Sequence, residues 1–219
     1  MTTSTTRRSP RRRTIPRRAI PLDARKQPTQ RRAAATVDAI LEAAARILET
    51  SGLPGYTTNA VAERAGVSVG SLYQYFPNRD ALTAALIERE SESLLVDVDA
   101  AAGAATCEAS LLALVHAAVT YQMRRPALAR VLDFEERRLP LDERDARVGE
   151  RIHAALVRAL GLGDAPQLDD RETAAHDVFA MVHGMVDAAG ERGETDADAL
   201  EARVRRAVIG YLWRTEQRR

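Results

Sequence analysis

The stretch AGVSVGSLYQYF, residues 65–76, combines a glycine, a serine suited to capping a helix, and a run of small, hydroxylated and aromatic residues. Gly66 offers the positive φ that a sharp turn between two helices needs, and Ser68 can cap the helix that follows. Pro77 and Asn78 end that helix. Most other helical faces of this chain are charged, so the uncharged outer face of this short helix calls for a functional explanation.

A second short helix precedes the turn, capped by Thr57 or Thr58 and ending near Arg64. Two helices that cross closely around a turn need a small residue at the crossing, and Ala62 meets that need. The pattern is that of a helix-turn-helix. A helical hairpin that merely packs is the alternative. The apolar residues that would hold the two helices to a third are Val61, Ala65, Val67, Leu72 and Tyr75.

The second helix of such a motif projects its outer face away from the protein. Small residues let a helix seat deeply in the major groove, while hydroxyl, amide and phenol groups can bond to bases or phosphates. Arg79, at the start of the next helix, adds a cation and a positive helix end for phosphate. The sequence therefore predicts a DNA-binding face. Its members are Val69, Gly70, Ser71, Tyr73 and Gln74.

The segment TTNAVAERAGVSVGSLYQYFPNRDALTAAL, residues 57–86, resembles the tetracycline-repressor (TetR) family, and the likeness extends over about residues 33–87. The resemblance implies a dimeric transcriptional repressor that responds to an effector. Family members usually carry lysine where Arg79 stands, and the planar guanidinium alters the geometry of a phosphate contact. Positions at which the family touches DNA correspond to Thr58, Asn59, Val69, Gly70, Ser71, Tyr73, Tyr75 and Arg79, and Gln74 is placed to read a base.

The composition favours helices throughout. Of 219 residues, 45% are hydrophobic, enough for a core, but only 4% are aromatic, while helix formers such as alanine, leucine and glutamate are abundant. We predict an all-α fold in which an N-terminal three-helix helix-turn-helix domain, residues 31–78, joins a larger C-terminal helical bundle with dimerisation helices, residues 79–219. Further helices are expected near residues 107–124, 127–138, 142–160, 171–190 and 197–215.

Residues 1–30 are predicted to form a disordered basic tail, because four prolines lie among arginines that repel one another. Residues 1–32 hold eleven basic side chains and one acidic side chain, which leaves 21 basic and 30 acidic side chains for the rest of the chain. The excess of positive charge in residues 1–32 favours an anionic partner at this end of the chain, whereas the excess of acidic residues in the rest of the chain does not. Two interpretations stay open, a solvated extension and an arm that contacts DNA.

The bundle offers candidate pocket and interface residues. By the resemblance, it encloses a pocket, and its last two long helices form a four-helix dimer interface with those of a second subunit. Apolar residues with two polar handles are typical of effector pockets, and the candidates are His116, Met123, Phe134, Phe179 and His183. Suitable apolar spacing for the interface is found at Val178, Val182, Met185, Val186, Leu200, Val204, Val208 and Tyr211.

Several classes of function are not expected. The single cysteine, Cys107, cannot form an intrachain disulfide, and no spacing of cysteine and histidine resembles a zinc site, so no metal or cofactor is predicted. No nucleophile elbow, phosphate loop or dinucleotide fingerprint is present, which argues against an enzyme. No apolar run reaches transmembrane length, and we expect a cytoplasmic protein.

The favoured function is a TetR-like DNA-binding regulator, a repressor that a small-molecule effector releases from its operator. The expected partners are duplex operator DNA, a second copy of the chain and an apolar small molecule, with no membrane. The alternative is a helix-turn-helix protein without a small-molecule effector, controlled by its abundance or by a protein partner. In that case the C-terminal bundle would be filled solid.

Overall fold

The computed structural model describes residues 31–213, without the side chains of residues 31–32 and 142–146. Over this range the chain forms nine helices and no strand, which confirms the predicted all-α class. The predicted basic tail, residues 1–30, lies outside the described residues. The helices are α1 (Arg31–Gly55), α2 (Thr58–Ala65), α3 (Val69–Tyr75), α4 (Arg79–Ala101), α5 (Cys107–Arg124), α6 (Pro126–Arg138), α7 (Asp142–Ala159), α8 (Arg171–Glu191) and α9 (Ala197–Trp213).

Helix α1 is interrupted near its predicted end. Gly52 takes a φ of 59° and a non-helical backbone conformation, which separates two helical segments. The first segment therefore stops near Ser51 and Gly52, as predicted. A short second segment, which includes Pro54 and ends at Gly55, was not predicted, and proline is tolerated in its first turn.

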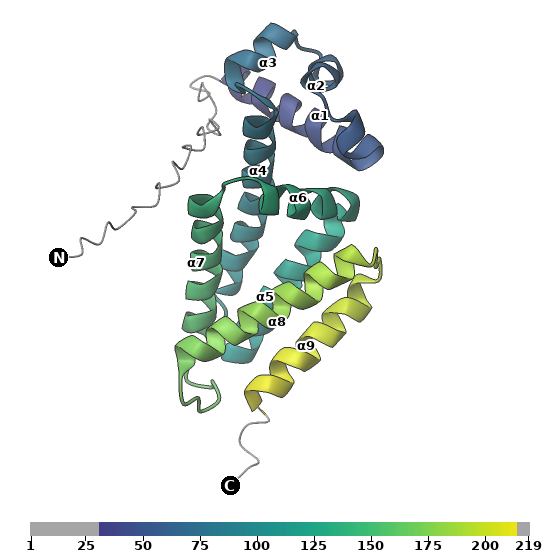
Figure 1. Ribbon diagram of the computed structural model, residues 1–219. Helices are drawn as coiled ribbons and strands as arrows, with labels where there is room; N and C mark the ends of the chain where they lie inside the picture. Colours follow the sequence, from purple (N-terminus) through teal and green to yellow (C-terminus); the bar gives the residue numbers. More distant parts are fainter. Residues whose placement is uncertain (1–30, 214–219) are drawn as a thin grey trace, which may run out of the picture.

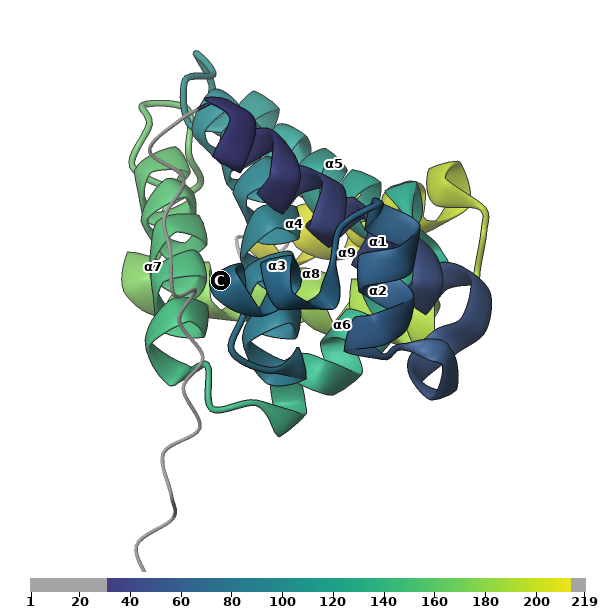
Figure 2. The same ribbon diagram turned by 90° about the horizontal axis from the view of Figure 1, so that it is seen from above.

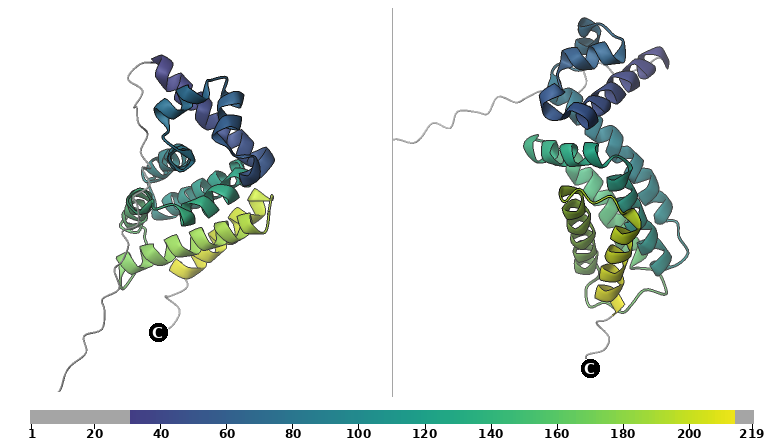
Figure 3. Two further views of the ribbon diagram at one scale, coloured as in Figure 1. Left: turned by 45° about the horizontal axis from the view of Figure 1, so that its top comes forward. Right: turned by 90° about the vertical axis from the view of Figure 1, so that its right-hand side faces the viewer.

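Helices α1, α2 and α3 gather at one end of an elongated molecule, and α9 lies toward the other end (Figure 1). Helix α4 runs from the first group into the larger bundle of α5, α7, α8 and α9, and both views in Figure 3 show the same division. Helix α6 crosses the molecule between the two groups. Seen from the α3 end, the first three helices lie over α6 and the bundle (Figure 2).

Two hydrophobic cores correspond to these groups. The first is built from the apolar faces of α1, α2, α3 and the beginning of α4, with Leu72 and Phe76 fully buried in it. Leu128 and Leu132 of α6 also belong to this first core. The second core joins the end of α4 to α5, α7, α8 and α9. The N-terminal core therefore continues past residue 78, since α6 packs directly against it.

Five of the residues expected at a dimer interface belong to the second core instead. Their side chains are between 0% and 5% exposed in the single protomer, because they point between α5, α8 and α9. They cannot face a second protomer, which corrects that part of the prediction. The five are Val178, Val186, Leu200, Val204 and Val208. Of the remaining three, Val182 and Met185 are half-buried and Tyr211 is exposed.

Within residues 31–213, no helix combines the length and the apolar character needed to cross a bilayer.

Candidate DNA-binding surface and effector cavity

The turn between α2 and α3 is fixed by its own residues. Gly66 lies in the left-handed region with φ of 68°, and its N–H donates to the carbonyl of Glu63 at 3.1 Å. Ser68 Oγ accepts from the N–H of Ser71 at 3.0 Å and so caps α3. The two helices therefore meet at a defined angle, as predicted from Gly66 and Ser68.

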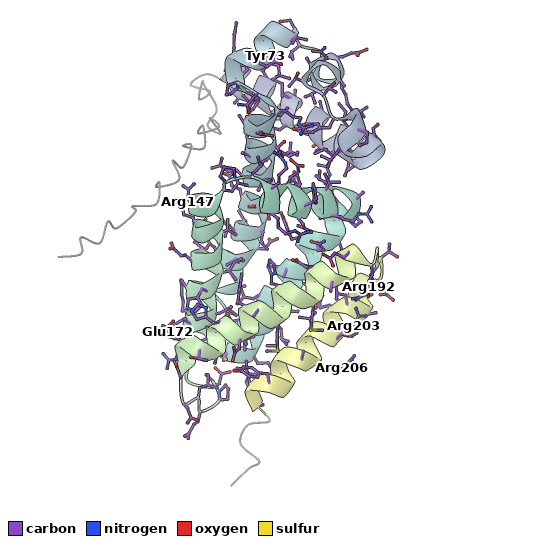
Figure 4. All side chains as sticks on the ribbon, in the orientation of Figure 1. Tyr73, Arg147, Glu172, Arg192, Arg203 and Arg206 are labelled. Carbon is purple, nitrogen blue, oxygen red and sulfur yellow. The ribbon has the colours of Figure 1, made fainter. Side chains whose placement is uncertain are left out.

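The outer face of α3 is exposed and uncharged. The side chain of Tyr73 is 40% exposed, and Val69, Gly70 and Gln74 are also exposed, while Ser71 is half-buried and holds its hydroxyl 2.8 Å from that of Ser68. Tyr73 lies at the end of the molecule farthest from α9 (Figure 4). The structure thus leaves this face open to a partner.

The start of α2 contributes to the same surface. The hydroxyl groups of Thr58 and Tyr73 lie 3.1 Å apart, within hydrogen-bonding distance, so the two helices present these groups together. Asn59 beside Thr58 is exposed. Tyr75 turns toward the first core and is half-buried, so at most one edge of its ring is available to a partner.

Arg79 supplies a cation beside this surface. It is the exposed first residue of α4, and Asn78 caps that helix by accepting from the N–H of Ala81 at 2.7 Å. The guanidinium carbon of Arg79 lies 5.9 Å from the centroid of the Tyr56 ring, within the range of a cation–π contact. Helix α4 therefore directs its positive N-terminal end and a held cation toward the side where α3 is exposed.

A network of ion pairs joins α1 to the C-terminal bundle. Arg125, between α5 and α6, donates from Nε to Glu49 at 2.6 Å and from Nη1 to Glu42 at 3.1 Å. Arg89 of α4 reaches Glu42 at 3.3 Å and the buried Glu90 at 2.6 Å. The hydrogen bond from Arg125 lowers the pKa of Glu49. One arginine at the α5–α6 junction thus holds two carboxylates of the first helix.

A second ionic contact lies at the other end of α6. Arg138 Nη2 is 2.6 Å from Asp80 Oδ1, at the start of α4, and 2.6 Å from the buried carboxylate of Glu135. One end of α6 is therefore bonded to α1, which packs under α2 and α3, and the other end to the start of α4. Sequence reasoning missed these contacts, because Arg125 and Glu42 are 83 residues apart and no periodicity links them.

A cavity of about 460 Å³ lies between α4, α5, α6, α7 and α8. Its volume falls within the range of roughly 300 to 1,000 Å³ that small-molecule sites occupy. Most of the wall is aliphatic, and the polar groups come mainly from α6 and α8. The lining residues include Leu94, Val98, Leu111, Leu114, Ile152, Leu156, Phe179 and Val182, together with Tyr121, Gln122, Asp133, His183 and Asp187.

The predicted effector residues divide into two groups. Phe179 and His183 line the cavity, with ring centroids 5.6 Å apart. His116 is instead exposed and lies 2.8 Å from Glu201, and Phe134 is 53% exposed. Met123 packs against the second core outside the cavity. The prediction is therefore wrong for these three, because neighbouring residues on a helix point about 100° apart, and the cavity is lined by Val115, Gln122 and Asp133, which directly precede them.

The sequence did not predict the acidic and amide side chains that line the cavity. Burial, together with the nearby carboxylate of Asp187, raises the pKa of Asp133 to about 6. The amide of Gln122 offsets this in part, although its nitrogen has no hydrogen-bond partner of ordinary geometry among the described residues. In the sequence, Asp133 has charged neighbours on its helix, a pattern typical of a solvent-exposed face. The sequence therefore gives no signal that this carboxyl lines a cavity.

Comparison with known proteins defines the class. The family model of bacterial regulatory proteins of the tetR family matches residues 40–86, and that of the tetracyclin repressor-like C-terminal domain matches residues 106–212. Together they cover more than half of the chain. The protein therefore belongs to the TetR family of bacterial regulatory proteins, as its helix-turn-helix and C-terminal bundle indicate. The fold and the family are those of transcriptional regulators.

Solved structures share the fold over most of the chain. The fatty acid degradation regulator FadR from Bacillus halodurans is similar, with a TM-score of 0.65 and 21% identity, over 79% of this chain and 97% of that one. A transcriptional regulator from Rhodococcus sp. Rha1 has a TM-score of 0.68 and 24% identity, over 82% of this chain and 96% of that one. Identities this low show the fold alone.

Curated relatives match over shorter segments. The nucleoid occlusion factor SlmA of Actinobacillus pleuropneumoniae serotype 5b is 30% identical over 100 residues, which are 45% of this chain and 50% of that protein. The HTH-type transcriptional repressor KstR of Mycolicibacterium smegmatis is 41% identical over 63 residues, or 29% of this chain and 31% of that protein. The chain thus spans about half the length of the first of these relatives.

Proposed function

We propose that the protein is a homodimeric transcriptional repressor that binds duplex operator DNA through α3 and is released by a small molecule bound in the cavity. The exposed, uncharged face of α3, joined to α2 by the Thr58–Tyr73 contact, is the observation that carries the proposal. A protruding helix of this kind fits the major groove, where hydroxyl, amide and phenol groups bond to base edges and phosphates.

The proposed DNA contacts fall into two kinds. Val69, Gly70, Ser71 and Gln74 lie on or near the outer face of α3 and are assigned to the groove, with Gln74 as the side chain that reads a base. The rest are assigned to phosphates and to positioning, and they are Thr58, Asn59, Tyr73, Tyr75 and Arg79. A dimer would present two copies of α3 to successive major grooves, about 34 Å apart along the duplex.

Substitutions at Arg79 and Gln74 test this division. We expect Arg79→Ala to weaken binding of all duplexes and to reduce the slope of log affinity against log salt by about 0.9. Gln74→Ala should instead relax preference at one base pair, by about 1 to 3 kcal/mol, and keep the salt slope. Operator fragments selected from the source genome, followed by anisotropy titrations at several salt concentrations, provide the measurement. Equal effects of both variants on every sequence would contradict the assignment.

The proposed dimer uses the outer faces of α8 and α9. No other helix covers the faces of α8 and α9 that point toward the viewer in Figure 1. Ala180 and Gly184, one turn apart on α8, are exposed there, and Tyr211 of α9 donates a hydrogen bond to Asp177 of α8 across the same two helices. Small residues permit close approach of a second copy. Val182, Met185 and Tyr211 remain candidates at the edges of this interface.

Gly184→Arg is expected to convert the dimer to monomer. A Cβ atom at Gly184 would meet nothing within 4 Å in the protomer, so the arginine costs no packing within one chain, but it would place a large cation between two copies. Light scattering after size-exclusion chromatography measures the change. Val96→Arg, at an exposed site on α4, is the matched control and should remain dimeric. A dimeric Gly184→Arg variant would place the interface elsewhere.

Release by an effector is supported by the position of α6. This helix contributes Asp133 to the cavity, and Arg125 and Arg138 at its two ends bond to α1 and α4. A ligand that shifts α6 would therefore change the position of the DNA-binding helices, within the limit set by its difference in affinity for the two conformations, about 1 to 3 kcal/mol. The cavity argues against the alternative of an effector-free regulator with a solid bundle.

A further inference from the structure

The cavity has an apolar body. Helices α4, α5 and α7 line it with aliphatic side chains, among them Leu94, Leu114 and Ile152. The tyrosine and phenylalanine of the wall, Tyr121 and Phe179, add two aromatic rings, and burial raises the pKa of Tyr121 well above its usual value, so its phenol stays neutral. A ligand that fills this space must bring a hydrocarbon or aromatic portion with it.

Three carboxylates from two helices line the same cavity. Asp133 and Glu136 come from α6 and Asp187 from α8, and burial together with the charge of Asp187 raises the pKa of Asp133. The adjacent basic group, Arg137, also lines the cavity and lowers the pKa of Asp133 in part, but it is exposed and lies 4.0 Å from the exposed Glu191, so it is shared with a carboxylate outside the cavity. His183 Nδ1 lies 3.4 Å from Asp187 Oδ2.

A buried amide lies beside these acids. Gln122 is 2% exposed and lines the cavity, and its side chain interacts with the carboxyl of Asp133 and lowers the pKa of that carboxyl in part. The amide nitrogen lies against Gly190 of α8 and has no hydrogen-bond partner of ordinary geometry among the described residues. Gln122 is neutral, so it positions Asp133 but supplies no positive charge to the acids of the cavity.

We propose that the effector is a lipophilic cation, an amine or quaternary ammonium with an apolar body, whose charge lies between Asp133 and Asp187. This assignment rests on the proposed effector-released function. A cation relieves the repulsion between the two carboxylates and is attracted to the aromatic faces of Tyr121 and Phe179. A neutral ligand would bury these carboxylates further without adding a positive charge, and an anion would add another negative charge beside them.

Three probes with one hydrocarbon body test the ligand class. They are 4-phenylbutylammonium, 4-phenylbutanol and 4-phenylbutyrate, titrated calorimetrically into the full chain. We expect the ammonium to bind at least about tenfold more tightly than the alcohol, and the carboxylate to bind most weakly. Asp133→Asn and Asp187→Asn should each reduce ammonium affinity by about tenfold and leave alcohol affinity unchanged. Asp99→Asn, outside the cavity, is the control with the same charge change and should have no effect on either.

The pH dependence gives a second readout. Three helices, α5, α6 and α8, place polar or charged groups near Asp133. These groups are Tyr121, Gln122, Glu136, Arg137, His183 and Asp187. Because the carboxyl of Asp133 ionises near pH 6, ammonium affinity should rise as the pH increases from 5 to 7. Asp133→Asn should flatten the part of the rise that Asp133 contributes.

The outcomes separate this proposal from the proposed function. Equal affinity for ammonium and alcohol, tighter binding of the carboxylate, or no ammonium binding would overturn the cationic class, and operator binding by α3 would be unaffected. Ammonium binding that fits the predictions but leaves the operator complex intact at saturation would instead refute release by an effector. Thermal unfolding of each variant checks that a lost affinity does not reflect a lost fold.

Discussion

Gly70→Glu should abolish operator binding and leave the fold intact. Gly70 is the second residue of α3 and is exposed, and a Cβ atom there would meet only Ser68 Oγ, at an ordinary 3.8 Å. Replacing a helical glycine removes a cost of roughly 0.5 to 1 kcal/mol, and an acid in the first turn interacts favourably with the helix dipole. The protomer therefore gains stability while its proposed groove-facing surface acquires a negative charge.

The expected loss of DNA affinity is at least about a hundredfold, because a like charge placed in a complementary interface costs several kcal/mol. Anisotropy titration with the selected operator at fixed salt measures it. Gly163→Glu, in the segment between α7 and α8, makes the same change where a Cβ atom would meet nothing within 4 Å, and should bind nearly as tightly as wild type. If both variants lost equal affinity, the effect would come from net charge and α3 would not be the contact.

Arg125→Leu should destabilise the protein by about 2 to 3 kcal/mol, in the range measured for hydrogen bonds to charged groups. The arginine side chain is 18% exposed and donates to both Glu42 and Glu49, so its removal leaves two carboxylates near each other without their shared partner. For a chain of this size the change corresponds to a fall in melting temperature of about 4 to 12 °C. Thermal or urea unfolding measures it.

Arg46→Leu is the matched control, because Arg46 contacts the same two glutamates, at 2.9 Å and 3.6 Å, but is 56% exposed. Pairs this exposed contribute about 0 to 1 kcal/mol. Equal free energies of unfolding for Arg125→Leu and Arg46→Leu would contradict the prediction, because they would mean that the burial of Arg125 does not strengthen its ion pairs. Arg125→Leu should also weaken the effect of a cavity ligand on operator binding, since it removes the ionic contact between the start of α6 and α1.

The pH dependence of the Arg125 effect has a defined sign. Arg125 lowers the pKa of Glu49 in the folded protein, so this pairing stabilises the fold above the unfolded pKa of roughly 4.3. The stabilisation is lost as the pH falls through the lower folded value. The difference in unfolding free energy between wild type and Arg125→Leu should therefore shrink below about pH 4.

Local features of the chain could be predicted well. Capping residues, a left-handed glycine and apolar spacing depend only on neighbours within a few positions, which is why Gly66, Ser68 and the bounds of α5 agree with prediction. The same local chemistry indicated that Tyr73 and Gln74 would be exposed. It also indicated the break at Gly52, but not the short helical segment that follows it in α1.

Partners distant in the chain could not be predicted. An apolar valine on α8 or α9 has the same spacing whether it faces a second copy or its own core, and Val178 and Val204 turned out to face the core. A histidine on a helix likewise gives no sign of its direction, so His183 lines the cavity while His116 is exposed. Which of two apolar faces is covered depends on helices that pack from elsewhere in the chain.

The sequence by itself determined the helices, the turn between α2 and α3 and the uncharged face of α3, because caps, glycine conformations and helical periodicity act over a few residues. Only the tertiary structure decided that α6 is bonded at one end to α1 and at the other to α4, and that Asp133 and Asp187 share one cavity. Those arrangements depend on side chains from separate helices meeting in space, and their energies arise from burial and distance that no local pattern encodes.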